Sequence, residues 1–559
     1  MKPILECIPN FSEGRDMGVI KQITDVIEAV EGAKLLDVDP GASTNRTVVT
    51  FVGDPEAVIE AAFQAIKKAS EVIDMRKHTG THPRMGATDV CPLVPISGIS
   101  AEEAVKYAHK LAERVGKELN IPIYLYEQAA QTPKRQNLAV IRAGEYEGFA
   151  DKIYQEEWKP DYGPQEFHAK AGQTVIGVRD FLVAYNVNLN TQSVRRANSV
   201  AFDIREKGRL KTEDGTPWGK KVLDADGNPV REAGACKSVK AIGWFVEEYG
   251  VAQVSANLTN LNDSPLHVVF EETRKSANHR GLRVTGSELV GLVPKKCLVD
   301  AGYYFLQQQG VSLGVSEEDL ILIAVKSMGL DELGPFDPKK KVIEYQLESE
   351  ERQLTDLDQR EFNNLLASDA PAPGGGSVAA LVGALGASLG AMVANLSGNK
   401  RGWDHRTAEF NPYAIQGQQL KDELLFLVNE DTAAFNKVME AFKLPKKSEA
   451  DQAARKQAIE DASKYAALVP FRVMETAMKS YDLLKAMAAE GNPNSITDAG
   501  VGALCTHTAV QGAGLNVEIN LGGIEDQVFC NEMASKVKNL VESSTKLSGE
   551  IMEIVRSKM

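Results

Sequence analysis

The sequence predicts a multidomain protein: two α/β subdomains, each a two-layer ferredoxin-like structure, followed by an all-α helical bundle. The first observation is that strand-like and helix-like segments alternate as far as Met328. The second is that little strand signal follows, because long runs with helical spacing dominate there. The third is the stretch 334–341, which is rich in proline and lysine and has the composition of a linker.

The N-terminal subdomain is expected at residues 1–173. Its predicted helices carry apolar residues three and four positions apart, and Pro55 lies in a first helical turn, where proline is well tolerated. Strands are expected over residues 4–9, 34–38, 46–52, 90–94 and 121–126, and helices over residues 17–30, 55–73 and 101–119. This order predicts helices packed on a sheet.

A similar order recurs in the C-terminal subdomain, expected at residues 174–333. Strands are expected over residues 175–189, 241–247, 251–258 and 282–285, and helices over residues 194–205 and 264–279. Between the first helix and the second strand, residues 206–235 are polar and glycine-rich and contain Asp226-Gly227, a hairpin signal. We expect this segment to be a surface excursion, and the sequence assigns it no role.

A linker is expected at residues 334–350 and the helical domain at residues 351–559. Its helices are expected over residues 356–367, 378–397, 415–440, 450–468, 471–489, 498–520 and 524–555. The helix at 378–397 is nearly uncharged and about long enough to cross a membrane. Because it consists mainly of Ala, Gly and Ser, without a second such segment, we expect a buried helix of a soluble bundle or an oligomer interface.

Composition limits the classes of function. The formal net charge of −14 argues against general nucleic-acid binding. The six cysteines are scattered without a C-x-x-C pair, so neither a zinc site nor a disulfide framework is indicated, and free thiols are typical of a reducing cytoplasm. The N-terminal residues contain no apolar stretch long enough for a signal peptide. We therefore expect a cytoplasmic protein.

The most informative stretch is the loop Lys77-His78-Thr79-Gly80-Thr81-His82-Pro83-Arg84-Met85-Gly86. It places two imidazoles and a guanidinium in a turn, and histidine is the usual proton carrier near neutral pH. On residue types alone, capping or surface histidines are the simpler explanation of the loop. A metal pair of His78 and His82 is the weakest reading, because the motif has no carboxylate or cysteine to complete a ligand set.

Four further polar stretches are candidate sites. The segment 37–46 joins two predicted strands and carries Asp39, Asn45 and Arg46; by itself it is also explained as a capped turn. The segment 163–172 lies between the two subdomains, where ligands often bind, and is equally an interdomain connection. The remaining two are in the helical half. They are the glycine loop 369–377, which could present backbone amides to an anion, and Asp431, which is a candidate acid or base only if it points into the bundle.

Together these stretches resemble one family over nearly the whole chain, the bifunctional formimidoyltransferase-cyclodeaminases. The resemblance depends on long motifs in a fixed order. They are Glu6-Cys7-Ile8-Pro9-Asn10-Phe11-Ser12-Glu13-Gly14, Leu36-Asp37-Val38-Asp39, Ser43-Thr44-Asn45-Arg46-Thr47, His82-Pro83-Arg84-Met85-Gly86-Ala87-Thr88-Asp89-Val90-Cys91-Pro92, Ala372-Pro373-Gly374-Gly375-Gly376-Ser377, Asp431 with Ala434-Phe435, and Lys443-Leu444-Pro445-Lys446.

The resemblance implies two reactions. The α/β half would transfer a formimino group from N-formimino-L-glutamate to N5 of tetrahydrofolate, in histidine degradation. The helical half would close 5-formiminotetrahydrofolate to 5,10-methenyltetrahydrofolate and release ammonia. Tetrahydrofolate, expected to be polyglutamylated, is then the one-carbon acceptor. Neither step needs a metal.

The resemblance also implies roles for particular residues. The catalytic residues would be His82 and Asp431. The folate segment would be Gly163, Pro164, Gln165, Glu166, Phe167, His168, Ala169, Lys170, Ala171 and Gly172, although the family often reads F-H-P where this chain has Phe167-His168-Ala169. Substrate-binding residues would be Asp39, Asn45, Arg46, Arg84, Gly374, Gly375, Gly376 and Ser377.

The chemistry of these residue types agrees with the implied reactions. One imidazole can accept the N5 proton and return a proton to the departing glutamate nitrogen. Arg46, Arg84 and Lys170 suit substrate carboxylates, and a buried Asp431 could protonate the departing ammonia. Two alternatives for the helical half stay open: a methenyltetrahydrofolate cyclohydrolase, which that half also resembles, and a non-catalytic oligomerisation module. The expected partners are small-molecule substrates and further copies of the chain, without nucleic acid or membrane.

Overall fold

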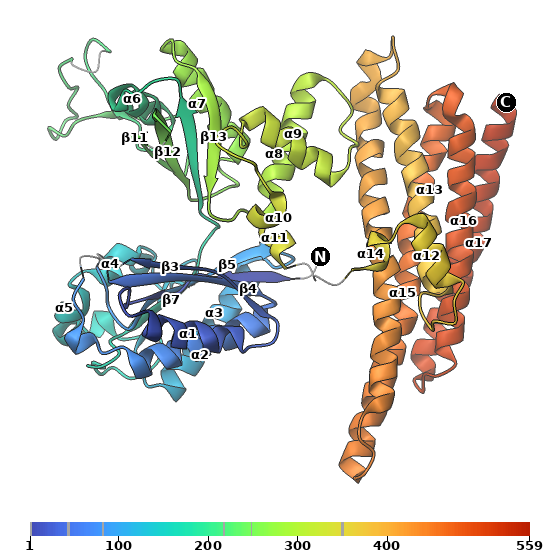
Figure 1. The fold of residues 1–559 in the computed structure, drawn as a ribbon, viewed down its shortest axis with the longest axis horizontal. Helices are drawn as coiled ribbons and strands as arrows, with labels where there is room; N and C mark the ends of the chain where they lie inside the picture. The colour runs from blue at the N-terminus through green and yellow to red at the C-terminus, as the bar shows by residue number, and fades with distance from the viewer. Residues whose placement is uncertain (1–2, 42–44, 81–82, 216–218, 248, 348–351) are drawn as a thin grey trace. The chain divides into compact units, whose positions relative to one another are not determined.

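A computed structural model describes residues 3–41, 45–80, 83–215, 219–247, 249–347 and 352–559. The chain is multidomain, with a mixed α/β region followed by a helical region (Figure 1). It divides into two compact units. Unit 1 comprises residues 1–298 and 328–348, and unit 2 comprises residues 299–327 and 349–559.

The first sheet of unit 1 is mixed and has seven strands. Its strands are β1 (Ile4–Cys7), β2 (Asn10–Phe11), β3 (Ala33–Gly41), β4 (Arg46–Gly53), β5 (Thr88–Ser97), β6 (Ile123–Glu127) and β7 (Thr174–Val178). Strands β1 and β2 both pair with β4 on one side and with β5 on the other, so they act as two parts of one interrupted strand. Strand β7 continues the sheet, pairing in parallel with β5 and β6.

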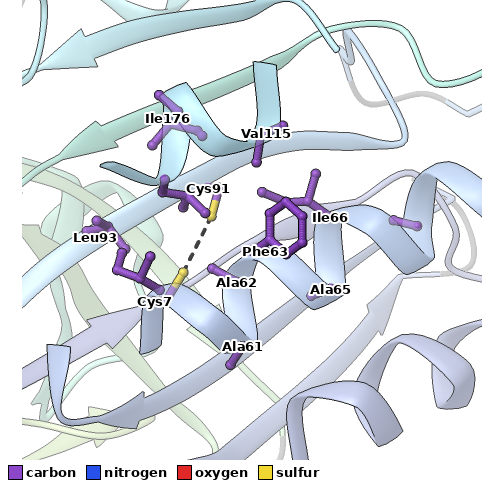
Figure 2. Close-up of a cluster of buried hydrophobic side chains, with 14 of the residues drawn as sticks. Cys7, Ala61, Ala62, Phe63, Ala65, Ile66, Cys91, Leu93, Val115 and Ile176 are labelled. Carbon is purple, nitrogen blue, oxygen red and sulfur yellow. Dashed lines mark hydrogen bonds between the residues drawn. The ribbon is translucent and has the colours of Figure 1, made fainter. Parts of the chain in front are cut away.

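Helices α1 (Met17–Glu28), α2 (Pro55–Val72) and α3 (Ala101–Glu118) share a core with one face of this sheet. Asp54 caps α2 ahead of Pro55, and Ser100 forms a capping box at the start of α3, so the sequence sets both helix starts. The fully buried thiols of Cys7 and Cys91 lie 3.5 Å apart in this core (Figure 2). Two short helices, α4 (Leu138–Arg142) and α5 (Glu145–Lys152), were not predicted.

The second sheet of unit 1 is antiparallel, in the order β11-β12-β8-β13. Its strands are β8 (Val183–Leu189), β11 (Val239–Val246), β12 (Val251–Leu258) and β13 (Val284–Val290), and its helices are α6 (Val194–Ile204) and α7 (Leu266–His279). The predicted strand 175–189 is therefore two strands in two different sheets. A boundary at 173/174 is corrected accordingly, because it would separate β7 from the first sheet.

Unit 2 is built from helices. They are the main part of α8 (Lys295–Gln309), α9 (Glu317–Met328), α12 (Gln359–Leu366), α13 (Gly375–Gly398), α14 (Thr407–Lys443), α15 (Glu449–Glu490), α16 (Ile496–Leu521) and α17 (Gln527–Lys558). The predicted helices 450–468 and 471–489 are one helix, because α15 continues through Pro470. Proline removes one backbone hydrogen bond but does not always end a helix that is held by packing.

Two further expectations need correction. Residues 299–327 were placed in the second subdomain, but they pack with unit 2: the Ser312 hydroxyl donates to Asn395 at 2.6 Å, and Asn395 donates to the Gly314 carbonyl at 2.7 Å. The described part of the expected linker 334–350 is folded into unit 1. It forms α10 (Pro338–Lys341) and α11 (Ile343–Gln346), and Val342 pairs with Val293.

Helix α13 is apolar and long enough to cross a membrane by length and composition, the one such helix among the described residues. Of its most apolar window, 61% is buried inside the protein. A core helix passes the same test, so the expectation that it belongs to a soluble bundle stays a prediction.

Candidate functional site

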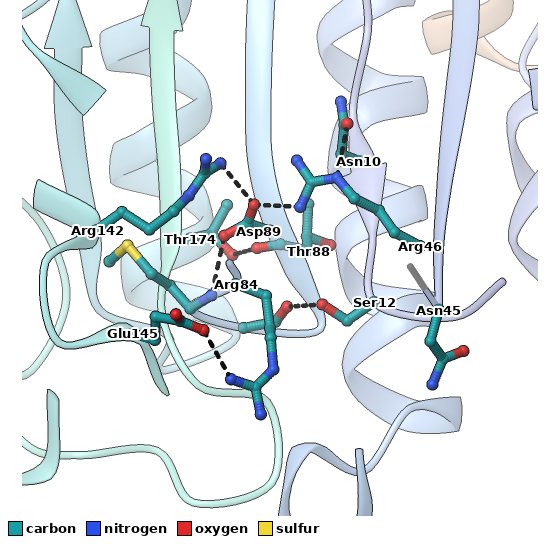
Figure 3. Close-up of polar contacts among 12 residues, drawn as sticks. Asn10, Ser12, Asn45, Arg46, Arg84, Thr88, Asp89, Arg142, Glu145 and Thr174 are labelled. Atoms are coloured by element: carbon teal, nitrogen blue, oxygen red, sulfur yellow. Dashed lines mark hydrogen bonds and ion pairs between the residues drawn. The ribbon is translucent and has the colours of Figure 1, made fainter. Parts of the chain in front are cut away.

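The transferase motif runs from the loop before β5 into that strand. Asp89 is fully buried in β5, and its carboxylate accepts a hydrogen bond from the Met85 backbone N–H at 2.9 Å (Figure 3). Arg46 of β4 forms an ion pair with the same carboxylate, and Arg142 donates to it at 2.7 Å. Asp89 thus ties the His-Pro-Arg-Met-Gly loop to two other elements. It lies within the motif that carried the resemblance, but sequence reasoning did not single it out.

Arg46 is held in this network by a second contact, because its Nε donates to the Asn10 side chain at 3.0 Å. Burial lowers the pKa of the Arg46 guanidinium, and the attraction of Asp89 opposes that shift. Since Asp89 is fully buried, a substrate carboxylate could not easily replace it. Arg46 therefore has a structural role in this arrangement, while a direct role at the substrate stays a prediction.

Arg84 has more exposed partners. Its guanidinium pairs with Glu147 at 2.6 Å and with Glu145 at 3.0 Å, and the hydrogen bond to Glu147 raises the pKa of Arg84. The two glutamates expose 64% and 42% of their side chains, so a substrate carboxylate could displace them. Of the two arginines, Arg84 has the partners that are more open to solvent, and its role in binding a substrate stays a prediction.

His82 lies outside the described residues, but His78 of the same loop is held firmly. Arg84 Nε donates to His78 Nδ1 at 3.2 Å, and His78 Nε2 lies 2.9 Å from the Asn45 carbonyl. An arginine can only donate, so Nδ1 accepts and Nε2 carries the proton. Asn45 itself has a left-handed backbone (φ 50°), and its amide donates to the Thr79 carbonyl at 2.9 Å. His78 and Asn45 thus support the loop, whereas Asp39 is exposed on β3.

The segment 163–172 lies beside the motif loop. Backbone hydrogen bonds join Ala87 to Ala171 at 2.7 Å and Gln173 to Met85 at 3.3 Å. A side chain on Gly172 would collide with the Met85 carbonyl oxygen at 2.3 Å, so this close approach requires glycine. The resemblance implied that both stretches serve the transfer reaction, and the structure brings their backbones together.

Side chains of this segment have local partners. Phe167 packs on Tyr146 with ring centroids 5.2 Å apart, and His168 Nδ1 accepts the Ala171 N–H at 3.0 Å. Lys170 donates to the Glu71 carbonyl at 2.6 Å, and Gln165 donates to the Ile153 carbonyl at 3.0 Å. Apart from Ala171 and Gly172, the remaining members of the segment lie in bends, turns or irregular backbone around these four. They are Gly163, Pro164, Glu166 and Ala169.

A cavity of about 410 Å³ in unit 1 was not predicted from the sequence. Its lining includes Glu6 of β1 with Arg179, Lys340 and Lys341. Burial raises the pKa of the Glu6 carboxyl to about 8, against the attraction of Arg179. Among the described residues, Glu6 Oε2 has no hydrogen-bond partner. A buried carboxyl with a raised pKa in a cavity is a candidate functional group, and only burial could reveal it.

In unit 2 the glycine loop and Asp431 meet. The Ser377 hydroxyl, in the first turn of α13, donates to Asp431 Oδ2 on α14 at 3.0 Å. A Cβ on Gly376 would lie 2.1 Å from Asp431 Oδ1, so the carboxylate approaches as closely as glycine permits, while Gly375 lies against Asn516 of α16 and Gly374 has open space. Burial raises the pKa of Asp431, and the bond from Ser377 partly opposes the shift.

The structure therefore places the half-buried Asp431 carboxylate against the start of α13, and its role as an acid or base stays a prediction. Within the described ranges, no group of three or more histidine, cysteine or acidic residues is arranged to hold a metal ion. The fold and these two sites define the chain as a multidomain enzyme of two parts, with one polar site in the α/β unit and another in the helical unit.

Comparison with known proteins identifies the family. The model of the N-terminal subdomain of the formiminotransferase domain matches residues 4–179, that of the formiminotransferase domain matches residues 184–348, and that of formiminotransferase-cyclodeaminase matches residues 358–539. The formimidoyltransferase-cyclodeaminase of Mus musculus is 42% identical over 546 residues, which are 97% of each chain. The chain belongs to the formimidoyltransferase-cyclodeaminase family.

Each half also resembles separate proteins. The glutamate formimidoyltransferase of Streptococcus pyogenes serotype M1 is 45% identical over 307 residues, 55% of this chain and 94% of that protein. The methenyltetrahydrofolate cyclohydrolase of Methylorubrum extorquens is 36% identical over 198 residues, 35% of this chain and 95% of that protein.

Proposed function

We propose that this protein transfers a formimino group from N-formimino-L-glutamate to N5 of tetrahydrofolate and then closes the product to 5,10-methenyltetrahydrofolate with release of ammonia. The observation that carries the proposal is the similarity to a two-activity relative along 97% of both chains. The contact between Asp431 and the glycine loop supports it for the second step, because it places a proton-carrying group beside open backbone at a helix start.

In the transfer step, N5 attacks the formimino carbon and loses a proton, while the glutamate nitrogen gains one and leaves. We propose His82 as the group that carries this proton, because imidazole serves as base and then as acid near neutral pH. Arg84 binds a substrate carboxylate in place of Glu147, and the segment 163–172 holds the folate beside the loop. Asp39, Asn45, Arg46 and Lys170 complete the proposed binding residues.

In the closing step, N10 attacks the same carbon, the proton that N10 loses passes to the departing nitrogen, and ammonia leaves once a second proton reaches that nitrogen. We propose that Asp431 starts protonated and supplies the proton that ammonia needs, which its burial favours. Gly374, Gly375, Gly376 and Ser377 then form the folate-facing start of α13. Tetrahydrofolate, polyglutamylated, is the carrier of the one-carbon group in both steps, and neither step uses a metal.

A second candidate function concerns unit 2 alone. Its likeness to a methenyltetrahydrofolate cyclohydrolase favours hydrolysis of the methenyl compound instead of its formation. Adding 5-formiminotetrahydrofolate and following ammonia, then adding 5,10-methenyltetrahydrofolate and following its loss, separates the two. Ammonia release in the first assay, without comparable hydrolysis in the second, supports cyclodeaminase activity. The reverse result supports the cyclohydrolase. If neither activity is detected, the helical unit would be a non-catalytic oligomerisation module.

Other features of the proposal follow from composition and topology. We propose a cytoplasmic homo-oligomer acting on small molecules, without nucleic-acid or membrane partners. We also propose that the α/β halves are ferredoxin-like, because the order β8-α6-β11-β12-α7-β13 is the strand–helix alternation of that fold.

The decisive experiment is a steady-state assay with formiminoglutamate and tetrahydrofolate that follows both glutamate and ammonia. We expect His82→Ala to lose more than about tenfold in glutamate release, or about 1.4 kcal/mol of barrier. Ammonia release from added 5-formiminotetrahydrofolate should be unchanged. His78→Ala is the matched control for loop support: it should lower the melting temperature of unit 1. If His82→Ala keeps glutamate release within tenfold of the parent, His82 is not the proton carrier.

A further inference from the structure

Residues 206–235, to which neither proposed reaction assigns a role, have a definite local fold in their described part. They include the loops beside α6 in Figure 1. Strand β9 (Arg209–Leu210) pairs with β10 (Arg231–Glu232), and backbone bonds join Val222 to Lys211 at 3.0 Å and Val230 to Val222 at 2.9 Å. Gly227, in the predicted hairpin turn, is left-handed with φ 81°. The excursion is therefore a small paired structure rather than an irregular loop.

This structure and the end of α6 enclose a cavity of about 350 Å³. Four basic side chains contribute to its lining: Arg205, Arg209, Lys221 and Arg231. They come from the end of α6, from β9, from the segment that is bridged to Thr212, and from β10. Glu232 is the acidic residue of the described lining. Four cations face one volume in a chain whose formal net charge is −14.

Arg209 and Arg205 have partners within the protein that explain their positions. Arg209 forms an ion pair with Asp203, but Asp203 also pairs with Arg280, so its charge is shared. Arg205 donates to the Gly208 carbonyl at 3.0 Å and lies over the Phe202 ring at 4.0 Å, as a cation at a helix C-terminus often does. Burial lowers the pKa of Arg205, and the charge of Arg231 lowers it further.

The other two cations have no such explanation. Neither the exposed side chain of Lys221 nor that of Arg231 donates a hydrogen bond or forms an ion pair with any residue in the described part of the chain. A helix C-terminus explains a single arginine, and a solvated surface explains scattered lysines. Neither of these two situations explains why Lys221 and Arg231 line one cavity together with two further arginines, because like charges that face each other oppose folding.

We propose that this cavity binds a small multivalent anion, a phosphorylated or polycarboxylate metabolite. Guanidinium groups bind phosphate and carboxylate oxygens in pairs, and Lys221 adds a mobile point charge. Phe202 supplies an apolar wall beside the charges. The bounded volume suits a small molecule rather than a polymer. The site is separate from both proposed reaction sites and lies in unit 1.

The test uses the full-length protein, titrated by calorimetry at low ionic strength with sodium pyrophosphate and, separately, with sodium citrate. We expect at least one to bind with a Kd below about 1 mM and to weaken as salt rises. Tighter binding of pyrophosphate assigns the site to phosphorylated ligands, and tighter binding of citrate assigns it to polycarboxylates. Absence of binding by both would overturn the proposal.

Variants locate the site. Lys221→Gln and Arg231→Gln should each weaken binding by about tenfold, because each removes a charge that faces the anion. Lys220→Gln is the matched control: it makes the same charge change one residue away, on a lysine that pairs with Glu213 at 3.1 Å and is not part of the lining. An equal loss in Lys220→Gln would show non-specific attraction and overturn the proposal. Circular dichroism melting verifies that the variants remain folded.

Discussion

The carboxylates of Asp89 in unit 1 and Asp431 in unit 2 have opposite surroundings. Asp89 is fully buried between the guanidinium groups of Arg46 and Arg142. Asp431 is half-buried, and the side chain that bonds to it is the neutral hydroxyl of Ser377. A carboxylate paired with two cations holds structure together, whereas burial without a neighbouring cation favours the protonated form.

The comparison gives each residue a different kind of role. Asp89 fixes the motif loop through the Met85 N–H, so it positions groups that react. Asp431 has its pKa raised by burial, so it is suited to carry a proton itself. The same substitution, aspartate to asparagine, should therefore damage the two units in different ways.

The largest expected effect is that of Asp89→Asn on stability. Removing the charge leaves two buried guanidinium groups facing a neutral amide, which should destabilise unit 1 by about 3–5 kcal/mol. Chemical unfolding followed by circular dichroism measures this loss. Asp431→Asn serves as the control, because burial already favours its neutral form, and it should cost unit 2 far less. Equal losses of stability in the two variants would mean that the pairing of Asp89 with two arginines adds nothing to stability beyond what Asp431 contributes.

Glu6 extends the comparison to a buried carboxyl that Arg179, in the lining of the same cavity, attracts. Its pKa is about 8 in the folded protein and near 4.5 when exposed, so the unfolded state loses its proton first as pH rises. Stability of unit 1 should therefore fall between about pH 4.5 and pH 8, by up to about 5 kcal/mol. Glu6→Gln should remove this slope, as measured by denaturant unfolding at several pH values. Glu56→Gln, at an exposed glutamate, should leave the slope unchanged; persistence of the slope in Glu6→Gln would assign it to another group.

The third prediction concerns catalysis by Asp431. Asp431→Asn nearly preserves the side-chain volume and removes the titrating proton, so ammonia release should fall roughly 10²-fold or more while transfer continues. Accumulation of 5-formiminotetrahydrofolate, followed by absorbance or chromatography, is the measurement. Unchanged ammonia release would exclude Asp431 from the reaction and direct attention to Asp498. A parallel fall in both activities with a lower melting temperature would indicate a structural role.

The smallest effect is expected from Gly376→Ala. The added Cβ would lie 2.1 Å from Asp431 Oδ1, so the carboxylate must move, and ammonia release should fall about tenfold. Gly549→Ala in α17, where nothing lies within 4 Å of an added Cβ, is the matched control and should keep the parental rate. A parental rate in Gly376→Ala would show that the position of Asp431 is not critical.

The sequence alone predicted much of the fold where local signals are strong. Pro55 and the spacing of apolar side chains placed α2 closely, and the same spacing placed α3 closely. Local signals were insufficient where the assignment of a strand or the end of a helix depends on the segments packed beside it. Strand β7 belongs to the first sheet because β5 and β6 lie on either side of it, and α15 continues through Pro470 because both sides of the proline are packed.

The candidate sites divide in the same way. Residue types and motif order indicated the glycine loop, Asp431 and the segment 163–172, because such motifs specify chemistry through neighbours in the chain. Only the tertiary structure decided that Arg46 is committed to Asp89, that the pKa of Glu6 is raised, and that Gly376 must be glycine. Burial and the approach of groups distant in sequence determine charge state and contact, and neither is encoded in a local pattern.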